Sequence, residues 1–223
     1  MLRLNTPEPL TLTQRPLELT PSRPLPGMDR AIPDTIPPDL MFREPSKKQL
    51  FADARRCQNA IDHIITLPAP DECLHFIVDG RYEPCDLIPA ISRLHPTHHI
   101  AQLTVTTLGL NTDNVWTIAS GMDQHKIDHA EILVSHYFSS VDKTEYAYLK
   151  QEIESRGGKV SFARTHTKLM LLEMSDATCF VVEGSGNMRS SNSIEQFQLT
   201  QSRPLLEFHR SWISDYLNSL PPQ

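Results

Sequence analysis

The spacing of apolar and polar residues divides the chain at about residue 46. Beyond Ser46, which can cap a first helix, apolar residues recur at helical spacing in some stretches and in short β-branched runs in others. The helical spacing predicts helices over residues 47–66, 86–94, 112–124, 144–156 and 204–220. The short apolar runs predict strands over residues 74–78, 100–108, 130–138, 160–163, 169–172 and 180–182. Strands that alternate with helices and end in a hairpin predict an α/β fold, a mixed sheet sandwiched by helices.

The first 45 residues follow another pattern, because 10 of the 18 prolines lie there. Each proline removes a backbone donor and holds the preceding residue in extended geometry, so no long helix fits. The leucines of this segment are too numerous for a purely solvated linker. The sequence therefore predicts a Pro-rich extended arm over residues 1–45, laid on the domain or on a partner chain, with a floppy tail as the alternative. One α/β domain is expected over residues 46–223.

Composition narrows the class of protein. The chain has 223 residues, 39% of them apolar, and a net charge of −6. The apolar content excludes wholesale disorder, and the acidic balance excludes a generally basic nucleic-acid coat while leaving room for a local basic cleft. The four cysteines form no CxxC pair and no secretory signal is visible, so buried thiols and a cytoplasmic protein are expected.

The chemically informative stretch begins at His166 and Lys168. Residues two apart on an extended strand share a face, so these two side chains are expected to project together, with Glu173 on the opposite side. An imidazole can act as nucleophile or proton carrier, and an ammonium group offsets the charge of a phosphate. A histidine beside a lysine thus suits an anionic, oxygen-rich substrate.

A second group of candidate residues follows the next expected strand. Gly184 and Gly186 would let the backbone approach a ligand closely, while Ser185 and Asn187 add a hydroxyl and an amide. Further along, Glu195 could hydrogen-bond to His166 and set its tautomer.

These residues resemble the signature of the phospholipase D superfamily, HxKxxxxD followed by GSxxN. The general character of the sequence is also similar to that of prophage-encoded members. The corresponding positions are His166, Lys168, Glu173, Gly184, Ser185 and Asn187, with Asn187 at the shorter spacing GSxN. Glu173 stands where the pattern has Asp, but on the side away from His166 a structural role tolerates the longer side chain. The long segment from Glu173 to Gly184 is expected to form a longer hairpin turn. The resemblance covers the chain from about residue 74 onward.

The resemblance implies a role for each site residue. His166 would be the nucleophile or the acid, acting through a phosphohistidine. Lys168 and Asn187 would bind the phosphate, and Ser185 would support them by a hydrogen bond. Glu195 would match the acidic residue that orients the histidine in single-motif members. No metal or cofactor is implied.

Basic charge is concentrated in the same region, in a run without acidic residues from Arg156 through Arg164 to Lys168, which Arg189 extends. Such a run beside a phosphate site fits a phosphodiester substrate bound with the help of Arg164 and Arg189, and a solvated helix end is the alternative. The histidines near residues 95–99 and 125–129 are interpreted as loop residues, because no metal-ligand spacing supports them.

The resulting hypothesis is a metal-independent phosphodiesterase, most plausibly a nuclease with nucleic acid as substrate and no membrane partner. The HxK motif occurs once in the chain, so two-histidine chemistry would need a homodimer with His166 facing its own copy. The alternatives are a phospholipid hydrolase or transphosphatidylase, and a non-catalytic module that binds nucleic acid or protein.

Overall fold

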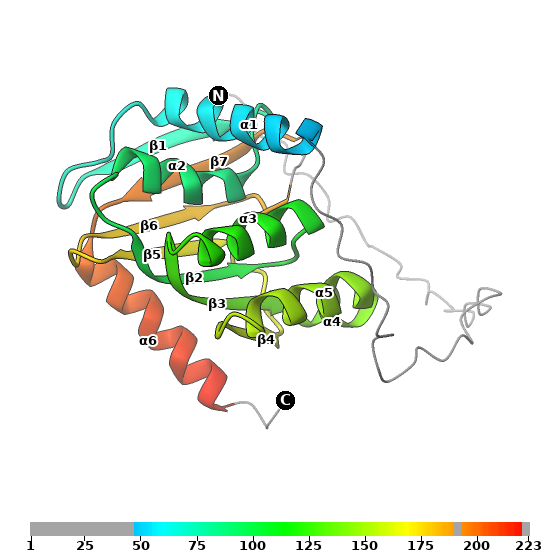
Figure 1. Ribbon diagram of the computed structural model, residues 1–223. Helices are drawn as coiled ribbons and strands as arrows, with labels where there is room; N and C mark the ends of the chain where they lie inside the picture. The colour runs from blue at the N-terminus through cyan, green and yellow to red at the C-terminus, as the bar shows by residue number, and fades with distance from the viewer. Residues whose placement is uncertain (1–46, 190–192, 220–223) are drawn as a thin grey trace, which may run out of the picture. The chain divides into compact units, whose positions relative to one another are not determined.

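The structure describes residues 47–189 and 193–219 of this computed structural model, in which helices separate the first strands, whereas no described helix lies between the last four (Figure 1). Residues 1–45 lie outside the described residues, so the extended arm expected there remains a prediction. A short 3-10 turn at Pro84–Asp86 precedes α2. The other elements, in chain order, are α1 (Lys47–Ile64), β1 (Cys73–Val78), α2 (Leu87–Leu94), β2 (Ile100–Thr107), α3 (Thr112–Asp123), β3 (Ile127–Ser135), α4 (His136–Val141), α5 (Lys143–Glu154), β4 (Lys159–Ala163), β5 (Leu169–Met174), β6 (Cys179–Gly184), β7 (Glu195–Thr200) and α6 (Arg203–Ser219).

The strands form one mixed sheet of seven strands in the order β1-β7-β6-β5-β2-β3-β4. β2, β3 and β4 run parallel, as expected for strands joined through helices. β5 pairs antiparallel with β2, and β6, β7 and β1 follow in antiparallel order. The mixed α/β sheet predicted from the sequence is therefore confirmed.

Helices cover both faces of this sheet. Along β5, Met170 and Leu172 belong to the core under α1, α2, α3 and α5, which follow one another along one side in Figure 1. Leu169 and Leu171 belong to the core under α6. This alternation of buried residues is the period of two that a strand between two helical layers requires. No helix in the two described ranges is long and apolar enough to cross a membrane.

Two elements differ from the sequence prediction. The strand expected to run to residue 138 ends at Ser135, because the Ser135 hydroxyl accepts a hydrogen bond from the Phe138 amide at 3.0 Å and caps α4. β7 was not predicted at all. It pairs with both β1 and β6, and its Phe197 and Leu199 are buried between more exposed glutamines.

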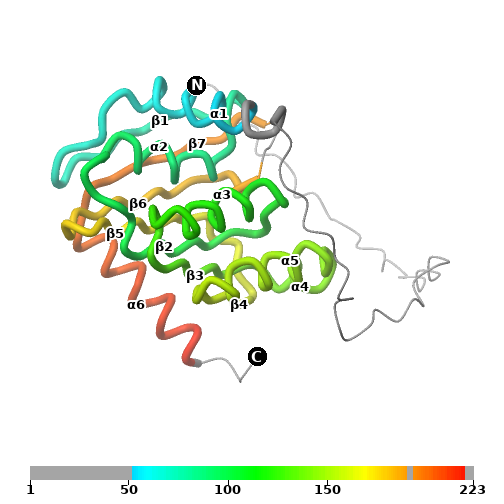
Figure 2. The backbone as a smooth tube through the Cα atoms, in the orientation of Figure 1, coloured from blue at the N-terminus to red at the C-terminus, as the bar shows by residue number. Residues whose placement is uncertain are grey.

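The strand directions bring many chain segments to one edge of the sheet. β1, β2, β3, β4 and β6 end at this edge, and β5 and β7 begin there. We call it the site edge, because the segments before β5, after β6 and at the start of β7 carry the candidate residues. The β5–β6 turn lies at the other end of the strands, at the left of Figure 2, which we call the opposite edge.

Buried acidic residues join the helices that cover the first face. Asp86 is 3% exposed and accepts hydrogen bonds from the Arg56 guanidinium at 3.0 Å and from the Glu83 amide at 2.7 Å. Glu83 in turn accepts hydrogen bonds from the side chains of Asn114 and Asn111 near the start of α3. Burial outweighs these interactions for Asp86, and raises the pKa of its carboxyl group to about 6.

Asp86 should make stability depend on pH. Its pKa in the folded state lies above the value of about 4 in the unfolded chain, so the folded protein binds more protons between these two values. The contribution of Asp86 to the free energy of unfolding should therefore fall by about 3 kcal/mol as the pH rises from about 3 to about 7. Urea unfolding across this range tests the prediction, and Asp86→Asn should remove this part of the slope. Asp53→Asn, which alters the other carboxylate bound to Arg56, should retain it.

Candidate functional site

His166 and Lys168 lie in the extended segment that leads into β5. Threonine hydroxyls hold this segment to the sheet, because Thr167 contacts the hydroxyl of Thr106 on β2 at 2.8 Å and that of Thr165 at 2.7 Å. The alternate residues are the exposed His166 and the partly exposed Lys168. Threonines thus anchor the segment, and the histidine and the lysine remain available at the site edge.

The two basic side chains contact each other. The Lys168 ammonium group donates to His166 Nδ1 at 2.7 Å and to the His166 carbonyl oxygen at 2.8 Å. Desolvation lowers the pKa of Lys168, and the nearby negative charge of Glu195 partly opposes this shift. Lys168 is therefore a partly desolvated cation beside an imidazole, an arrangement suited to an oxyanion.

Ser185 connects β6 to the start of β7. Its hydroxyl donates to the Glu195 carboxylate and accepts from the Gln196 amide at 3.0 Å, while its own amide donates to the Gln196 carbonyl at 3.0 Å. These bonds fix the position of the Gly184–Asn187 segment relative to Glu195. Within the described part of the chain, no hydrogen bond joins Glu195 to His166, so the expected orienting contact is absent in this state.

Gly184 and Gly186 are required by packing against β7. A Cβ atom on Gly184 would lie 2.2 Å from the Phe197 ring, and one on Gly186 would lie 2.9 Å from Glu195 Cγ. Both distances are too short for any side chain. The sequence attributed these glycines to close approach of a ligand, whereas contact with β7 by itself accounts for them.

Asn187 places an unpaired polar atom at the site edge. Its Oδ1 is the buried side-chain atom that lacks a hydrogen-bond partner among the described residues. The following amide, of Met188, donates to the Thr107 hydroxyl at the end of β2 at 3.3 Å and so ties the segment to the sheet. A buried polar group without a protein partner is unfavourable unless something else satisfies it, as a ligand would.

Glu173 lies far from these groups. It is on the face of β5 that α6 covers, near the opposite edge, where Arg203 Nη1 is 2.6 Å from Oε1 and Arg210 binds Oε2. The hydrogen bond from Arg203 lowers the pKa of Glu173, burial opposes it, and Arg210 lowers it further. Glu173 therefore attaches α6 to the sheet through its two arginine partners.

The basic run of the sequence is divided by the fold. Arg156 pairs with Asp123 at 2.8 Å and with Glu152 at 2.9 Å, and Lys159 pairs with Glu131 at 3.2 Å. They lie at or before the start of β4, about 13 Å of strand away from the site edge. The interpretation of residues 156–168 as one basic patch was therefore wrong.

At the site edge, Arg164 is exposed, and Arg189 lies 3.8 Å from Asp142. Lys168 and these two arginines are positive charges on segments at the site edge. Thr106 and Thr107, which the sequence analysis did not single out, position the site from β2. In the sequence, the one feature that could have identified them was a pair of threonines at the end of a buried β-branched strand.

The comparisons with known proteins concern the fold. No family profile matches the sequence, and no curated protein matches it. A polyphosphate kinase from Porphyromonas gingivalis is similar over 72% of this chain, with 10% identity and a TM-score of 0.51, but only 26% of the kinase is covered. This chain thus spans about a quarter of that enzyme.

A second solved structure is similar over nearly the whole of its own length. It is Nuc from Salmonella typhimurium, a phospholipase D family member, with 12% identity and a TM-score of 0.50 over 66% of this chain and 95% of Nuc. The mixed sheet and this similarity show that the chain has the phospholipase D fold. The resemblance noted in the sequence is confirmed at the level of the fold.

Glu173 should contribute to the stability of the fold. Glu173→Gln weakens two ion pairs with α6 and should lower the free energy of unfolding by about 1–2 kcal/mol. Chemical denaturation measures this loss. Glu207→Gln, at a more exposed partner of Arg203, should cost less than about 0.5 kcal/mol. A Glu173→Gln protein that is as stable as the wild type would contradict this role.

Proposed function

We propose that this protein is a metal-independent phosphodiesterase that cleaves nucleic acid through a phosphohistidine at His166. The observation that supports it most is the meeting of three segments at the site edge of a phospholipase D fold. One carries His166 and Lys168, one carries Ser185 and Asn187, and one carries Glu195. These side chains supply a nucleophile, a cation and hydrogen-bonding groups for a phosphate.

In the proposed reaction, a ring nitrogen of His166 attacks phosphorus, so that a P–N bond forms and the bond to the leaving oxygen breaks. A proton from an acid neutralises that oxygen. Water then attacks the phosphohistidine, which restores the imidazole and releases the second product. Lys168 offsets the charge that builds up on the non-bridging oxygens, and Asn187 contacts the same phosphate.

The contact between Lys168 and His166 defines a resting state in this proposal. While Nδ1 accepts from the ammonium group, the proton of a neutral imidazole lies on Nε2. A bound phosphate draws the Lys168 ammonium group onto its oxygens and releases Nδ1. The ring then changes tautomer by proton exchange with water, which takes the proton from Nε2 and places one on Nδ1. Glu195 accepts the new Nδ1–H in place of the Ser185 hydroxyl, and the unprotonated Nε2 is free to attack.

The acid that protonates the leaving group is assigned to a second copy of His166. The chain contains a single HxK motif, and a two-fold axis at the site edge would bring the same histidine to the other side of the phosphate. The proposal therefore includes a homodimer.

Nucleic acid is proposed as the substrate because of the charge at the site edge. The chain is acidic overall, with a net charge of −6, yet Lys168, Arg164 and Arg189 lie on the segments next to the site. Such local positive charge favours a phosphodiester within a polyanion. A phospholipid substrate and a purely binding role remain as outcomes of the experiment.

Cleavage of bis-p-nitrophenyl phosphate, plasmid DNA and RNA in excess EDTA tests the reaction. His166→Ala should abolish turnover, and Lys168→Ala and Asn187→Ala should each lower kcat at least about 100-fold, because each removes a transition-state contact. His129→Ala, an exposed histidine near the start of β3, is the matched control and should retain full activity. Rapid quenching in base, in which the P–N bond of a phosphohistidine survives, followed by mass spectrometry should find the phosphoryl group on His166.

Three outcomes would contradict the proposal. Choline or glycerol release from phospholipid vesicles without nucleic-acid cleavage would identify a lipid enzyme. Nucleic-acid binding that His166→Ala leaves unchanged, without turnover, would identify a binding module. Normal rates in both Lys168→Ala and Asn187→Ala would show that the site lies elsewhere.

The homodimer has its own test. Sedimentation velocity should show a dimer at the concentrations that support turnover. When wild-type protein is exchanged with an excess of His166→Ala chains, activity per wild-type chain should fall towards zero, because each shared site would lose one histidine. A fully active monomer, or unchanged activity in the mixture after verified exchange, would disprove the shared site.

A further inference from the structure

A second cluster of chemically active side chains lies at the opposite edge of the sheet. His95 and His98 are in the loop between α2 and β2, and Asp176 is in the β5–β6 turn. His95 Nε2 is 2.9 Å and His98 Nε2 is 3.6 Å from the same oxygen, Oδ2 of Asp176. His95 and Asp176 are 81 residues apart, so the sequence spacing that identifies most metal sites could not reveal this cluster.

We propose that His95, His98 and Asp176 form a binding site for a divalent transition-metal ion of the Zn²⁺ class. Their ligand atoms all lie within 4.8 Å of one another. Atoms that bind one tetrahedral zinc at 2.0–2.1 Å are about 3.3 Å apart, and the two distances to Asp176 fall on either side of this value. Two imidazoles and one carboxylate are typical zinc ligands, and water can complete the coordination.

Neighbouring hydrogen-bonding groups orient Asp176 and His98 as metal ligands. The amide of Thr178 donates to Oδ1 of Asp176 at 2.9 Å, which directs Oδ2 towards the histidines. The Ser175 hydroxyl is 3.4 Å from Nδ1 of His98, on the ring nitrogen that does not face the carboxylate. Hydrogen bonds of this kind hold the ligands of known metal sites in place. The neighbouring backbone is also joined, since the Ser175 amide donates to the His99 carbonyl at 2.8 Å.

The β5–β6 turn that carries Asp176 has a constrained backbone. The residue that follows, Ala177, has a φ of +66°, a conformation that few residues without a special constraint adopt. The turn is thus held in a defined shape with its carboxylate directed at the histidines.

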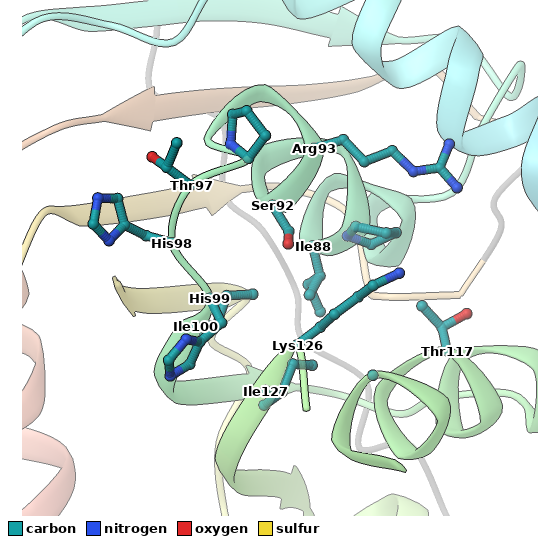
Figure 3. A pocket seen from close by; sticks show the side chains of 13 residues that line it. Ile88, Ser92, Arg93, Thr97, His98, His99, Ile100, Thr117, Lys126 and Ile127 are labelled. Atoms are coloured by element: carbon teal, nitrogen blue, oxygen red, sulfur yellow. The ribbon is translucent and has the colours of Figure 1, made fainter. Parts of the chain in front are cut away.

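The site is open to an ion from solution, because the side chains of His95, His98 and Asp176 are 24%, 37% and 25% exposed. His98 also lines a pocket of about 480 Å³ with Arg93 and Lys126, although His95 and Asp176 do not line it (Figure 3). In Figure 3 the charged ends of Arg93 and Lys126 extend to the other side of the pocket from His98, so they do not occupy the side on which the imidazole lies. A bound ion would join the α2–β2 loop to the β5–β6 turn and so stabilise the opposite edge, far from the groups proposed for phosphodiester cleavage.

Untagged full-length protein, stripped with EDTA and dialysed, is titrated with ZnCl₂ by calorimetry. One zinc ion per chain should bind, and at free zinc 100-fold above Kd the melting temperature should rise by about 5–10 °C. Co²⁺ should give the visible absorption bands of a four-coordinate nitrogen and oxygen site. His98→Ala and Asp176→Asn should each weaken zinc binding at least 10-fold and remove these bands.

Two control variants separate this site from its neighbours. His99→Ala removes an adjacent histidine that pairs with Asp128, and Cys73→Ser removes a thiol 3.6 Å from His75. Both should bind zinc as the wild type does. No zinc binding by the wild type, or binding that survives both His98→Ala and Asp176→Asn, would overturn the proposal. Phosphodiester cleavage in EDTA is measured separately, so failure of either proposal leaves the other standing.

Discussion

The antiparallel pairing of β5 with β2 determines where every candidate residue lies. Thr106, near the end of β2, is opposite Leu169, the first residue of β5, so the segment before β5 meets the ends of the parallel strands. The same reversal then carries the end of β6 and the start of β7 to that edge. Had β5 joined as another parallel strand, Lys168 would lie at the far end of the sheet from Thr107.

Local sequence signals were sufficient where a segment is decided by its own residues. The β-branched run over residues 100–108 and the apolar spacing in 112–124 identified β2 and α3 almost to their ends. β7 was missed because Gln196, Gln198 and Thr200 make the segment polar on one side, although the alternation with Phe197 and Leu199 is a strand pattern. The strand forms because β1 and β6 both offer a pairing edge, which only the tertiary structure shows.

The candidate site was predictable to the extent that its residues are close in sequence. The pairs His166 with Lys168 and Ser185 with Asn187 follow from local spacing. The bonding of Glu195 to Ser185 does not, and neither does the loss of Arg156 and Lys159 to acidic partners. The cluster of His95, His98 and Asp176 at the opposite edge was even less predictable, because Asp176 comes from a distant part of the chain. Distances between charges separated by dozens of residues depend on topology.

Phe197 links the interior to the site edge. Its ring fills the space beside Gly184, touches the position of a side chain on Gly186 and stacks on Phe76 at a centroid distance of 6.1 Å. The shape of the segment that ends in Asn187 is therefore set by an aromatic pair in the core. Replacing Phe197 by an aliphatic residue would keep every polar residue of the candidate site. It would nevertheless change the shape of the Gly184–Asn187 segment and so the surface presented to a ligand. The surface presented to a ligand therefore depends on a residue that is itself only 1% exposed.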